Sequence, residues 1–339
     1  MRKFISSLFL FLVIFLLIVS VKNQLIPYHV GNPTYSSKLR TFEANSDKFN
    51  AVAFGSSRIY RQLNPILLDS LLGNYSFSTY NLASAGCYNP ESYFQYENFI
   101  ESLETGEIKY AFLEIQPLHT FGRSNEKTTR GSYWNNLSFL NYSIKYILHS
   151  DSKTKVASIK SYISSFIFRL FDYSIILNSF NRNVFEQGSN GFFSLEDQMK
   201  VNTSYYNRAK EFQSDTTILN ARIESAAQIA SIKKSNIEVN DIHYKSLLRL
   251  IDTSDRNGIH LFLIIPPRLS SSTYKALIPI CNALPDSNVI ELAEYPKYKE
   301  LYLVKNTFDA GHLNDEGADI FTSALAREVN EILDYEAEK

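Results

Sequence analysis

The sequence predicts an α/β fold, in which helices cover a parallel β-sheet, preceded by one membrane-spanning helix. Three observations carry this prediction: an uncharged apolar run at the N-terminus, short apolar segments that alternate with helix-start signals, and a composition suited to a large core. The chain has 339 residues, of which 45% are hydrophobic and 20% are charged. This composition excludes disordered and fibrous proteins.

The first element is the uncharged run over residues 4–21, FISSLFLFLVIFLLIVSV, which follows Arg2 and Lys3. About 18 helical residues span roughly 27 Å, close to the thickness of a hydrocarbon core. Because no small-residue cleavage site follows, we interpret the run as a signal anchor; the alternative is a cleaved signal peptide. The basic residues should stay in the cytoplasm, which predicts a single-pass protein with its domain in the periplasm or at the cell surface.

Residues 22–49 are polar, contain two prolines and show no sustained period, so we expect a tether. The domain itself should cover residues 50–337. It opens on the apolar run 51–54, AVAF, which Gly55 ends, as expected for a buried parallel strand. Asn64 followed by proline then predicts a helix start.

Strands and helices continue to alternate along the rest of the domain. Further strands are predicted at residues 77–84, 110–116, 260–266 and 289–293. Further helices are predicted at residues 89–106, 272–284 and 314–335. This alternation favours a parallel sheet with helices on both faces, which is an α/β sandwich.

An insertion over about residues 120–240 interrupts this alternation and is expected to be mainly helical. Within it, seven apolar side chains recur at helical spacing: Ile159, Tyr162, Ile163, Phe166, Ile167, Leu170 and Phe171. We interpret the insertion as a helical subdomain packed on the sheet; the alternative is a surface that rests on the membrane. It also carries more basic than acidic residues, a surplus small enough to be ordinary solvated surface.

Charge and cysteine content exclude several functional classes. Thirty-four basic and 35 acidic residues leave a net charge of −1, so no overall field attracts nucleic acid. Cys87 and Cys281 cannot form a disulfide scaffold or a four-ligand zinc site. No cluster of His, Cys, Asp and Glu has metal-site spacing, so we expect no metal and no organic cofactor.

Polar residues follow the predicted strands, where open parallel sheets bind their ligands. Ser57 lies just after the first strand, and Asp309 and His312 lie just before the last helix. These residues supply the three groups of a Ser-His-Asp triad, in which the imidazole takes the serine proton and the carboxylate orients the ring. Gly86 follows the second strand, and a backbone N–H beside a glycine can approach an oxyanion closely.

The order of these segments resembles the SGNH/GDSL hydrolase superfamily. FGSSR resembles its nucleophile block, with Ser57 as nucleophile and Ser56 in place of the usual aspartate. NLASAG resembles the second block, with Gly86 as oxyanion glycine, and DAGHLN resembles the last block. The resemblance covers residues 50–118 and 258–335.

The resemblance implies a flavodoxin-like three-layer sandwich with strand order 2-1-3-4-5. It also implies an acyl-enzyme on Ser57 and oxyanion donors at Ser57 and Gly86. The anchor, the GSS motif and the insertion are most similar to envelope branches of the superfamily, namely the D-alanyl transfer protein of teichoic acid modification and the alginate O-acetylation proteins.

One block departs from the superfamily pattern. The third strand usually ends in Gly-x-Asn-Asp, whose Asn donates to the oxyanion, but this chain has LEIQPLH. Gln116 could supply the same amide, or Asn89 could serve instead. We also predict that Arg58, Asn89 and His119 bind substrate; the alternatives are a structural ion pair for Arg58 and a solvated loop position for His119.

These residues predict a serine enzyme of ester chemistry, and the resemblance implies an extracytoplasmic ester hydrolase or O-acyltransferase that removes or transfers an acetyl or other small acyl group on an envelope or exported polysaccharide. Expected partners are the acyl-ester or glycan substrate, the membrane, and a membrane protein that delivers the acyl donor. One alternative is a lipase or esterase that uses the amphipathic helix as a lid. Another is a non-catalytic component of a polysaccharide-modification system, which the altered third block favours and the intact triad disfavours.

Overall fold

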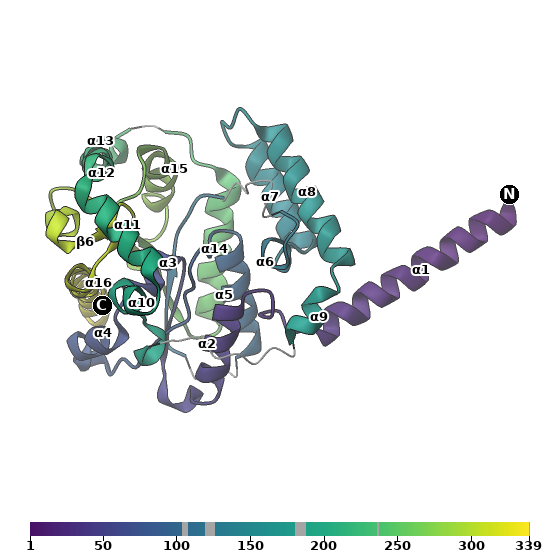
Figure 1. Cartoon of the computed structure of the whole chain (residues 1–339), viewed down its shortest axis with the longest axis horizontal. Coiled ribbons are helices and arrows are strands. Elements are labelled where there is room, and N and C mark those ends of the chain that lie inside the picture. The colour runs from purple at the N-terminus through teal and green to yellow at the C-terminus, as the bar shows by residue number, and fades with distance from the viewer. Residues whose placement is uncertain (104–107, 119–125, 180–187, 236, 339) are drawn as a thin grey trace.

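Five parallel strands form the central sheet of the computed structural model (Figure 1), which describes residues 1–103, 108–118, 126–179, 188–235 and 237–338. The strand order is β2-β1-β3-β4-β5, so the predicted order 2-1-3-4-5 is confirmed. The strands are β1 (Ala51–Phe54), β2 (Thr79–Asn81), β3 (Tyr110–Glu114), β4 (His260–Ile265) and β5 (Val289–Glu291). All four neighbouring pairs are parallel, so the carboxyl ends of the strands meet at one edge.

Helices cover both faces of this sheet, which gives the predicted three-layer α/β architecture. Helices α4 (Pro65–Leu71) and α16 (Asp315–Ala337) lie on one face, and α5 (Glu91–Ser102) and α14 (Asp241–Arg256) lie on the other (Figure 1). The remaining helix of the sheet region is α15 (Ser271–Cys281), between β4 and β5. Short 3₁₀ turns occupy Ser46–Lys48, Gly73–Tyr75, Ser189–Gly191, Asp286–Asn288, Lys299–Tyr302 and Val304–Asn306.

The core lies on the three inner strands, β1, β3 and β4, which bury almost only apolar side chains. All four residues of β1 are fully buried, and the stacked rings of Phe112 and Phe262 join β3 to β4 with centroids 5.2 Å apart. The exception is Glu114, a fully buried carboxylate at the carboxyl end of β3. Burying a carboxylate is costly unless it is hydrogen-bonded, so Glu114 is expected to bind a polar group at the end of the sheet.

The predicted helical insertion is present between β3 and α14. Its helices are α6 (Thr129–Ser132), α7 (Leu137–Leu148), α8 (Lys155–Phe171), α9 (Ser174–Ser179), α10 (Leu195–Val201), α11 (Thr203–Ser214), α12 (Thr217–Ala227) and α13 (Ile229–Lys233). Helices α7 and α8 pack against each other, whereas α12 and α13 pack on α15 and α11 lies beside β6 (Thr307–Asp309). The second group therefore approaches the carboxyl edge of the sheet.

The prediction of a tether over residues 22–49 is wrong in its second half. Residues Pro33–Glu43 form helix α2, and the Asn32 side chain caps it by accepting from the Tyr35 N–H. The apolar side chains that α2 buries are Tyr35, Leu39 and Phe42. Their spacing of four and three residues is helical. Two serines and one threonine lie between them, so the segment reads as polar in the sequence and the helix was not predicted.

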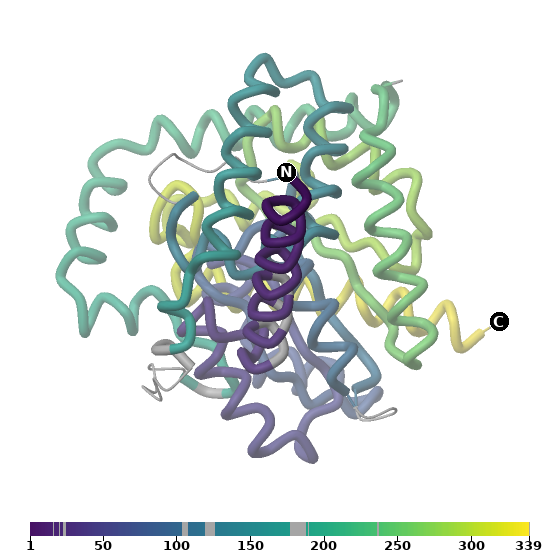
Figure 2. Tube along the Cα trace, turned by 90° about the vertical axis from the view of Figure 1, so that its right-hand side faces the viewer, coloured from purple at the N-terminus to yellow at the C-terminus, as the bar shows by residue number. Residues whose placement is uncertain are grey.

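Helix α1 (Arg2–Leu25) projects away from the body of the protein (Figures 1 and 2). Among the described residues it is the one helix long and apolar enough to cross a membrane. Its base contacts the insertion: the Lys22 Nζ donates to the carbonyl oxygens of Arg169 and Leu170 at 2.6 and 3.2 Å. These carbonyls belong to the last turn of α8, where the helix dipole favours a cation.

Candidate active site

The turn after β1 requires a glycine. Gly55 has φ +152°, and a Cβ there would lie 2.7 Å from Ile59 Cγ1 and 2.8 Å from Glu114 Cβ. The next residue, Ser56, donates its N–H to Glu114 Oε2 at 2.7 Å. This bond explains the buried carboxylate on β3, because it fixes the start of the short helix α3 (Ser57–Tyr60) above the end of β1.

The two adjacent serines of this turn have different surroundings. Ser56 is fully buried, and its Oγ accepts the Arg58 N–H at 3.2 Å, which caps α3. Ser57 is partly exposed, and its Oγ lies 2.7 Å from Nε2 of His312. Ser57 is therefore the hydroxyl that a histidine base can deprotonate.

A tight antiparallel hairpin carries the other two residues of the predicted triad. Strand β6 ends at Asp309, and β7 (His312–Leu313) begins three residues later. Asp309 Oδ1 accepts from the Gly311 N–H and from His312 Nδ1, both at 2.8 Å. The turn thus orients the carboxylate toward the imidazole, and the structure joins Ser57, His312 and Asp309 in one hydrogen-bonded chain.

A buried arginine holds this hairpin in place from below. Arg268 follows β4, adopts φ +65° and is fully buried. Its guanidinium donates to the carbonyl oxygen of Leu301 at 2.7 Å, to that of His312 at 3.0 Å and to Thr307 Oγ1 at 2.7 Å. Burial lowers the pKa of Arg268 to about 10, so the side chain stays charged at neutral pH.

A second arginine reaches the triad from the insertion. Arg208, on α11, places its Nη2 2.5 Å from Asp309 Oδ2 and 3.1 Å from Nδ1 of His312. Asp309 is therefore flanked by His312 on one carboxylate oxygen and by the Arg208 guanidinium on the other. Helix α11 lies far from Asp309 in the sequence, so its position depends on the packing of the insertion.

These contacts set the protonation states of the pair. Burial lowers the pKa of His312; the hydrogen bond and charge of Asp309 oppose this, and the charges of Arg58 and Arg208 add to the lowering. Burial would raise the pKa of Asp309, but the hydrogen bond from His312 and the charges of His312 and Arg208 outweigh it, so the pKa is lowered. The carboxylate is thus charged and the imidazole neutral at pH 7, as a base requires.

Replacing Arg208 by glutamine should shift the pH dependence of serine reactivity. Because its positive charge disfavours a protonated imidazole, removing it raises the pKa of His312. Reaction at Ser57 needs the neutral imidazole, so the acid limb of the rate profile should move to higher pH. The rate of fluorophosphonate labelling across pH 5 to 9 measures this, with the matched surface variant Arg256→Gln as control. An unchanged acid limb would show that Arg208 does not act on His312.

Of the three predicted oxyanion donors, Ser57 begins helix α3, and Gly86 and Gln116 lie on the segments that follow β2 and β3. The loop after β2 is joined to the β1 turn by the Ser84 N–H, which donates to the Gly55 carbonyl oxygen at 3.1 Å. Gly86 sits two residues further on, in a left-handed turn with φ +70°. Gln116 follows β3, is 5% exposed, and has no hydrogen-bond partner for either side-chain polar atom among the described residues.

The predicted substrate-binding residues have three different outcomes. Arg58, the residue after Ser57, is half-buried and lines a cleft. Asn89 is fully buried, and its amide nitrogen donates to the Gln116 carbonyl oxygen at 3.0 Å and to the Tyr142 hydroxyl at 3.1 Å. Its side-chain N–H groups are therefore engaged within the protein while its Oδ1 has no partner among the described residues, and its role in substrate binding stays a prediction. His119 lies outside the described residues.

The cleft that Arg58 lines has a volume of about 290 Å³. It lies beyond the carboxyl ends of β1, β3 and β4, where open α/β sheets bind ligands. Its walls include Arg58, Gln116, Leu118, Arg222 and Ser270. Among the described residues, no three His, Cys, Asp or Glu side chains are grouped so as to hold a metal ion.

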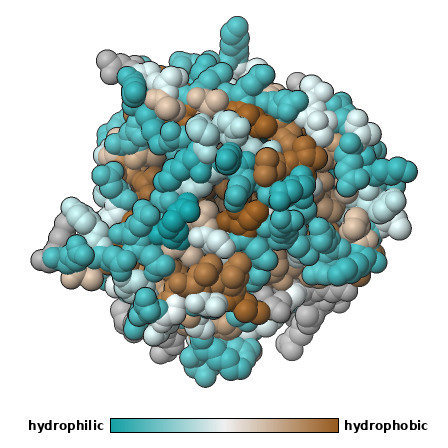
Figure 3. Space-filling view, turned by 90° about the vertical axis from the view of Figure 1, so that its left-hand side faces the viewer, coloured by the Kyte–Doolittle hydropathy of each residue, from teal (hydrophilic) through white to brown (hydrophobic). Residues whose placement is uncertain are grey.

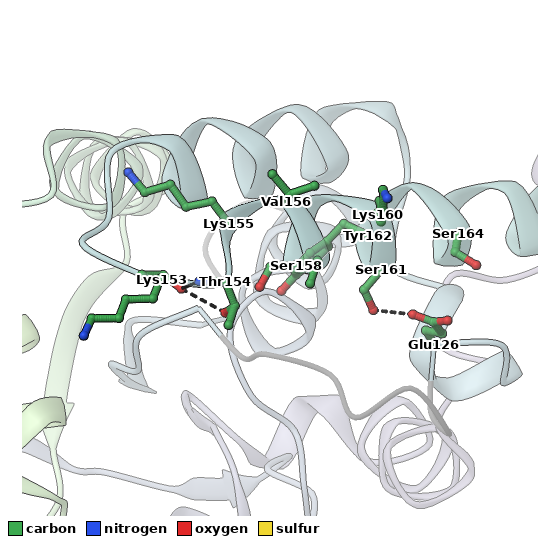
Figure 4. A pocket seen from close by; sticks show the side chains of 12 residues that line it. Glu126, Lys153, Thr154, Lys155, Val156, Ser158, Lys160, Ser161, Tyr162 and Ser164 are labelled. Carbon is green, nitrogen blue, oxygen red and sulfur yellow. Dashed lines mark hydrogen bonds between the residues drawn. The ribbon is translucent and has the colours of Figure 1, made fainter.

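A larger cavity of about 1010 Å³ lies elsewhere, along the first half of α8. Figure 4 shows that lysine and serine side chains surround it, including Lys153, Lys160 and Ser161. No triad residue lines this cavity, so its size does not make it the catalytic pocket. The smaller cleft is lined by Arg58, the residue after Ser57, and by residues that follow β3 and β4, so it is the candidate site.

Sequence reasoning missed three residues that shape the site. Glu114 could have been found, because a carboxylate inside the apolar run YAFLEIQ is unexpected in a buried strand. Arg268 and Arg208 carry no local signal, because their partners lie more than 30 residues away.

Comparison with known proteins does not assign the chain: no family model matches it, and no curated protein matches it.

Proposed function

We propose that this protein is a serine-dependent ester hydrolase or O-acyltransferase. The observation that carries the proposal is the chain of contacts from Ser57 Oγ to His312 Nε2 at 2.7 Å and from His312 Nδ1 to Asp309 Oδ1 at 2.8 Å. A hydroxyl, a base and an orienting carboxylate in this order are the parts of nucleophilic acyl transfer. The resemblance of the motifs to SGNH/GDSL hydrolases supports the same chemistry.

In the first half of the reaction, Ser57 Oγ attacks the acyl carbonyl carbon while its proton passes to Nε2 of His312. The bond from that carbon to the leaving alcohol then breaks, and the alcohol takes the proton from His312. In the second half, water or a sugar hydroxyl attacks the acyl-enzyme and gives its proton to His312. His312 returns the proton to Ser57 Oγ as the acyl group leaves.

The oxyanion formed in each half needs donors near Ser57. As the first residue of α3, Ser57 has an N–H with no helical partner. We assign this N–H and that of Gly86 to the oxyanion, with the unpartnered amide of Gln116 as the third donor. One such donor typically contributes about 10²–10³ to turnover.

The proposed substrate is an acyl ester of an envelope or exported polysaccharide. The cleft carries two arginines, which suits a polar substrate better than a fatty acyl chain. Helix α8, the candidate lipase lid, contributes none of the described residues that line the cleft and instead contacts the base of α1. These observations favour the polysaccharide over the lipid alternative.

The proposal is tested by incubating the full-length protein in neutral detergent with a fluorophosphonate probe and, separately, with p-nitrophenyl acetate. We expect covalent labelling at Ser57 and hydrolysis of the acetyl ester, both abolished by heat denaturation. A folded protein that is not labelled by the probe and does not hydrolyse the ester would refute the proposed enzymatic activity. The alternative of a non-catalytic component would then remain.

We also predict that the domain lies outside the cytoplasm and stays attached to the membrane. Arg2 and Lys3 precede the apolar run, and basic residues on that side favour an orientation with the remainder outside the cytoplasm. The face of the protein away from α1 is largely hydrophilic with separate apolar patches (Figure 3), as expected for a surface in water. Protease added to spheroplasts should digest the domain while a cytoplasmic marker stays intact. Full protection of the domain would contradict this topology.

A further inference from the structure

Two arginines, Arg58 and Arg222, line the candidate cleft without a counter-ion among the described residues. Arg58 follows the nucleophile, and its Nη2 lies 3.6 Å from where a Cβ on Gly311 would stand, next to the triad hairpin. Arg222 comes from α12 of the insertion. The Nε atoms of both side chains are buried without a hydrogen-bond partner, and neither guanidinium has an ion pair among the described residues.

No acidic residue among the described lining residues balances these two charges. Asp309, the carboxylate of the neighbouring hairpin, is already engaged by Arg208 and His312. Burial lowers the pKa of Arg222, and the charge of Arg58 lowers it further, so the two cations repel each other. Like charges that share a partly buried space are stabilised when an anion lies between them.

A buried amide in the same cleft also lacks partners. Gln116 is 5% exposed, lines the cleft, and leaves both Oε1 and Nε2 without a hydrogen bond to any described residue. Buried side-chain polar atoms are in large majority hydrogen-bonded, so an unpartnered amide points to a ligand with donors and acceptors of its own. A sugar hydroxyl supplies both. The cleft thus combines two guanidinium groups, of Arg58 and Arg222, with the neutral side-chain amide of Gln116.

We propose that this cleft binds an anionic sugar, one that carries a carboxylate or phosphate, as the part of the substrate that gives or receives the acyl group. Arg58 and Arg222 bind the carboxylate or phosphate of this sugar between them. Gln116 forms a hydrogen bond with a hydroxyl of the same ring or with the acyl oxygen. Guanidinium groups match carboxylate and phosphate through paired N–H donors. The volume of about 290 Å³ suits one sugar unit rather than a long chain.

This inference rests on the proposed acyl transfer for its biological meaning, but binding can be measured without catalysis. Full-length protein in neutral detergent is titrated by calorimetry with methyl glucuronide, glucose 6-phosphate and methyl glucoside. We expect both anionic sugars to bind at least tenfold more tightly than the neutral one, and their ratio tells carboxylate from phosphate. Equal affinity for all three sugars would overturn the proposal.

Single variants identify the residues responsible. Arg58→Gln and Arg222→Gln should each weaken the anionic sugars by about 10- to 100-fold, since each removes one charged hydrogen-bonding group. The matched control is Arg256→Gln, on the exposed end of α14, where Arg256 pairs with Asp252. Arg222→Gln is the more specific of the two tests. Arg58 is adjacent to Ser57, so its replacement also changes the surroundings of the proposed nucleophile, whereas Arg222 lies on the insertion. Undiminished binding by Arg222→Gln would contradict the proposed site.

Ester kinetics then separate failure of this proposal from failure of the enzyme. The wild type should hydrolyse an acetylated glucuronide with a higher kcat/KM than acetylated glucoside, and Arg222→Gln should lower the ratio of the two values. Hydrolysis of both esters without preference refutes the anion site and keeps the enzyme. Selective binding of the anionic sugars by a protein that hydrolyses no ester refutes the enzyme and keeps the site.

Discussion

Replacing Ser57 by alanine should abolish acyl-enzyme formation and lower ester turnover by about four to six orders of magnitude. The change removes the hydroxyl that lies 2.7 Å from Nε2 of His312, which in the proposed reaction is the group that receives the acyl group. The triad acts as a unit, so a Ser57→Ala/His312→Ala double variant should lose little more than either single variant. The measurement is p-nitrophenyl acetate turnover together with fluorophosphonate labelling.

Ser56→Ala is the matched control for this prediction, because the two serines are adjacent. Ser56 is fully buried, with an Oγ that caps α3, so its loss should cost about 1 kcal/mol of stability and leave labelling in place. Thermal denaturation of both variants shows that each is folded. If Ser57→Ala still forms the acyl-enzyme while Ser56→Ala does not, the nucleophile has been assigned to the wrong serine.

The sheet could be predicted because each of its strands carries its own local signal. The run AVAF ended by glycine, and the run LFLII ended by proline, are apolar throughout and short, as strands buried on both faces are. The asparagine before the last helix acts as the expected cap, since the Asn314 side chain accepts from the Gly317 N–H at 2.9 Å. Asn89 gave the same helix-start signal, but its side chain turned inward to bind the end of β3.

The triad could be predicted because its residues sit at sequence positions fixed by the topology, after the first strand and before the last helix. The surrounding charges could not. Arg208 and Arg222 lie on helices whose place over the sheet edge depends on packing across the insertion, not on any local pattern. A charged residue on a half-exposed helix looks like any solvated surface residue until its neighbour in space is known.

Asp309→Asn should lower turnover by about four orders of magnitude, since the aspartate sets the tautomer of the base. The structure gives a specific reason. In the wild type, Oδ1 of Asp309 accepts from the Gly311 N–H and from His312 Nδ1, while Arg208 Nη2 lies 2.5 Å from Oδ2. An amide has one acceptor oxygen, and the guanidinium draws that oxygen toward itself. The NH₂ group then faces His312 Nδ1, so the imidazole proton moves to Nε2 and the ring cannot accept the proton of Ser57.

This account predicts that Arg208→Gln changes turnover in opposite directions in the two backgrounds. In the wild type, the change raises the pKa of His312 and so lowers turnover at neutral and acidic pH. In Asp309→Asn, it removes the cation that holds the amide in the wrong orientation, so the oxygen can return to Gly311 and His312 and turnover should rise. Ester turnover at pH 7 of the wild type, both single variants and the double variant measures this, with thermal denaturation to verify folding. A double variant less active than Asp309→Asn alone would show that Arg208 does not set the orientation of residue 309, and that the aspartate acts on His312 by charge alone.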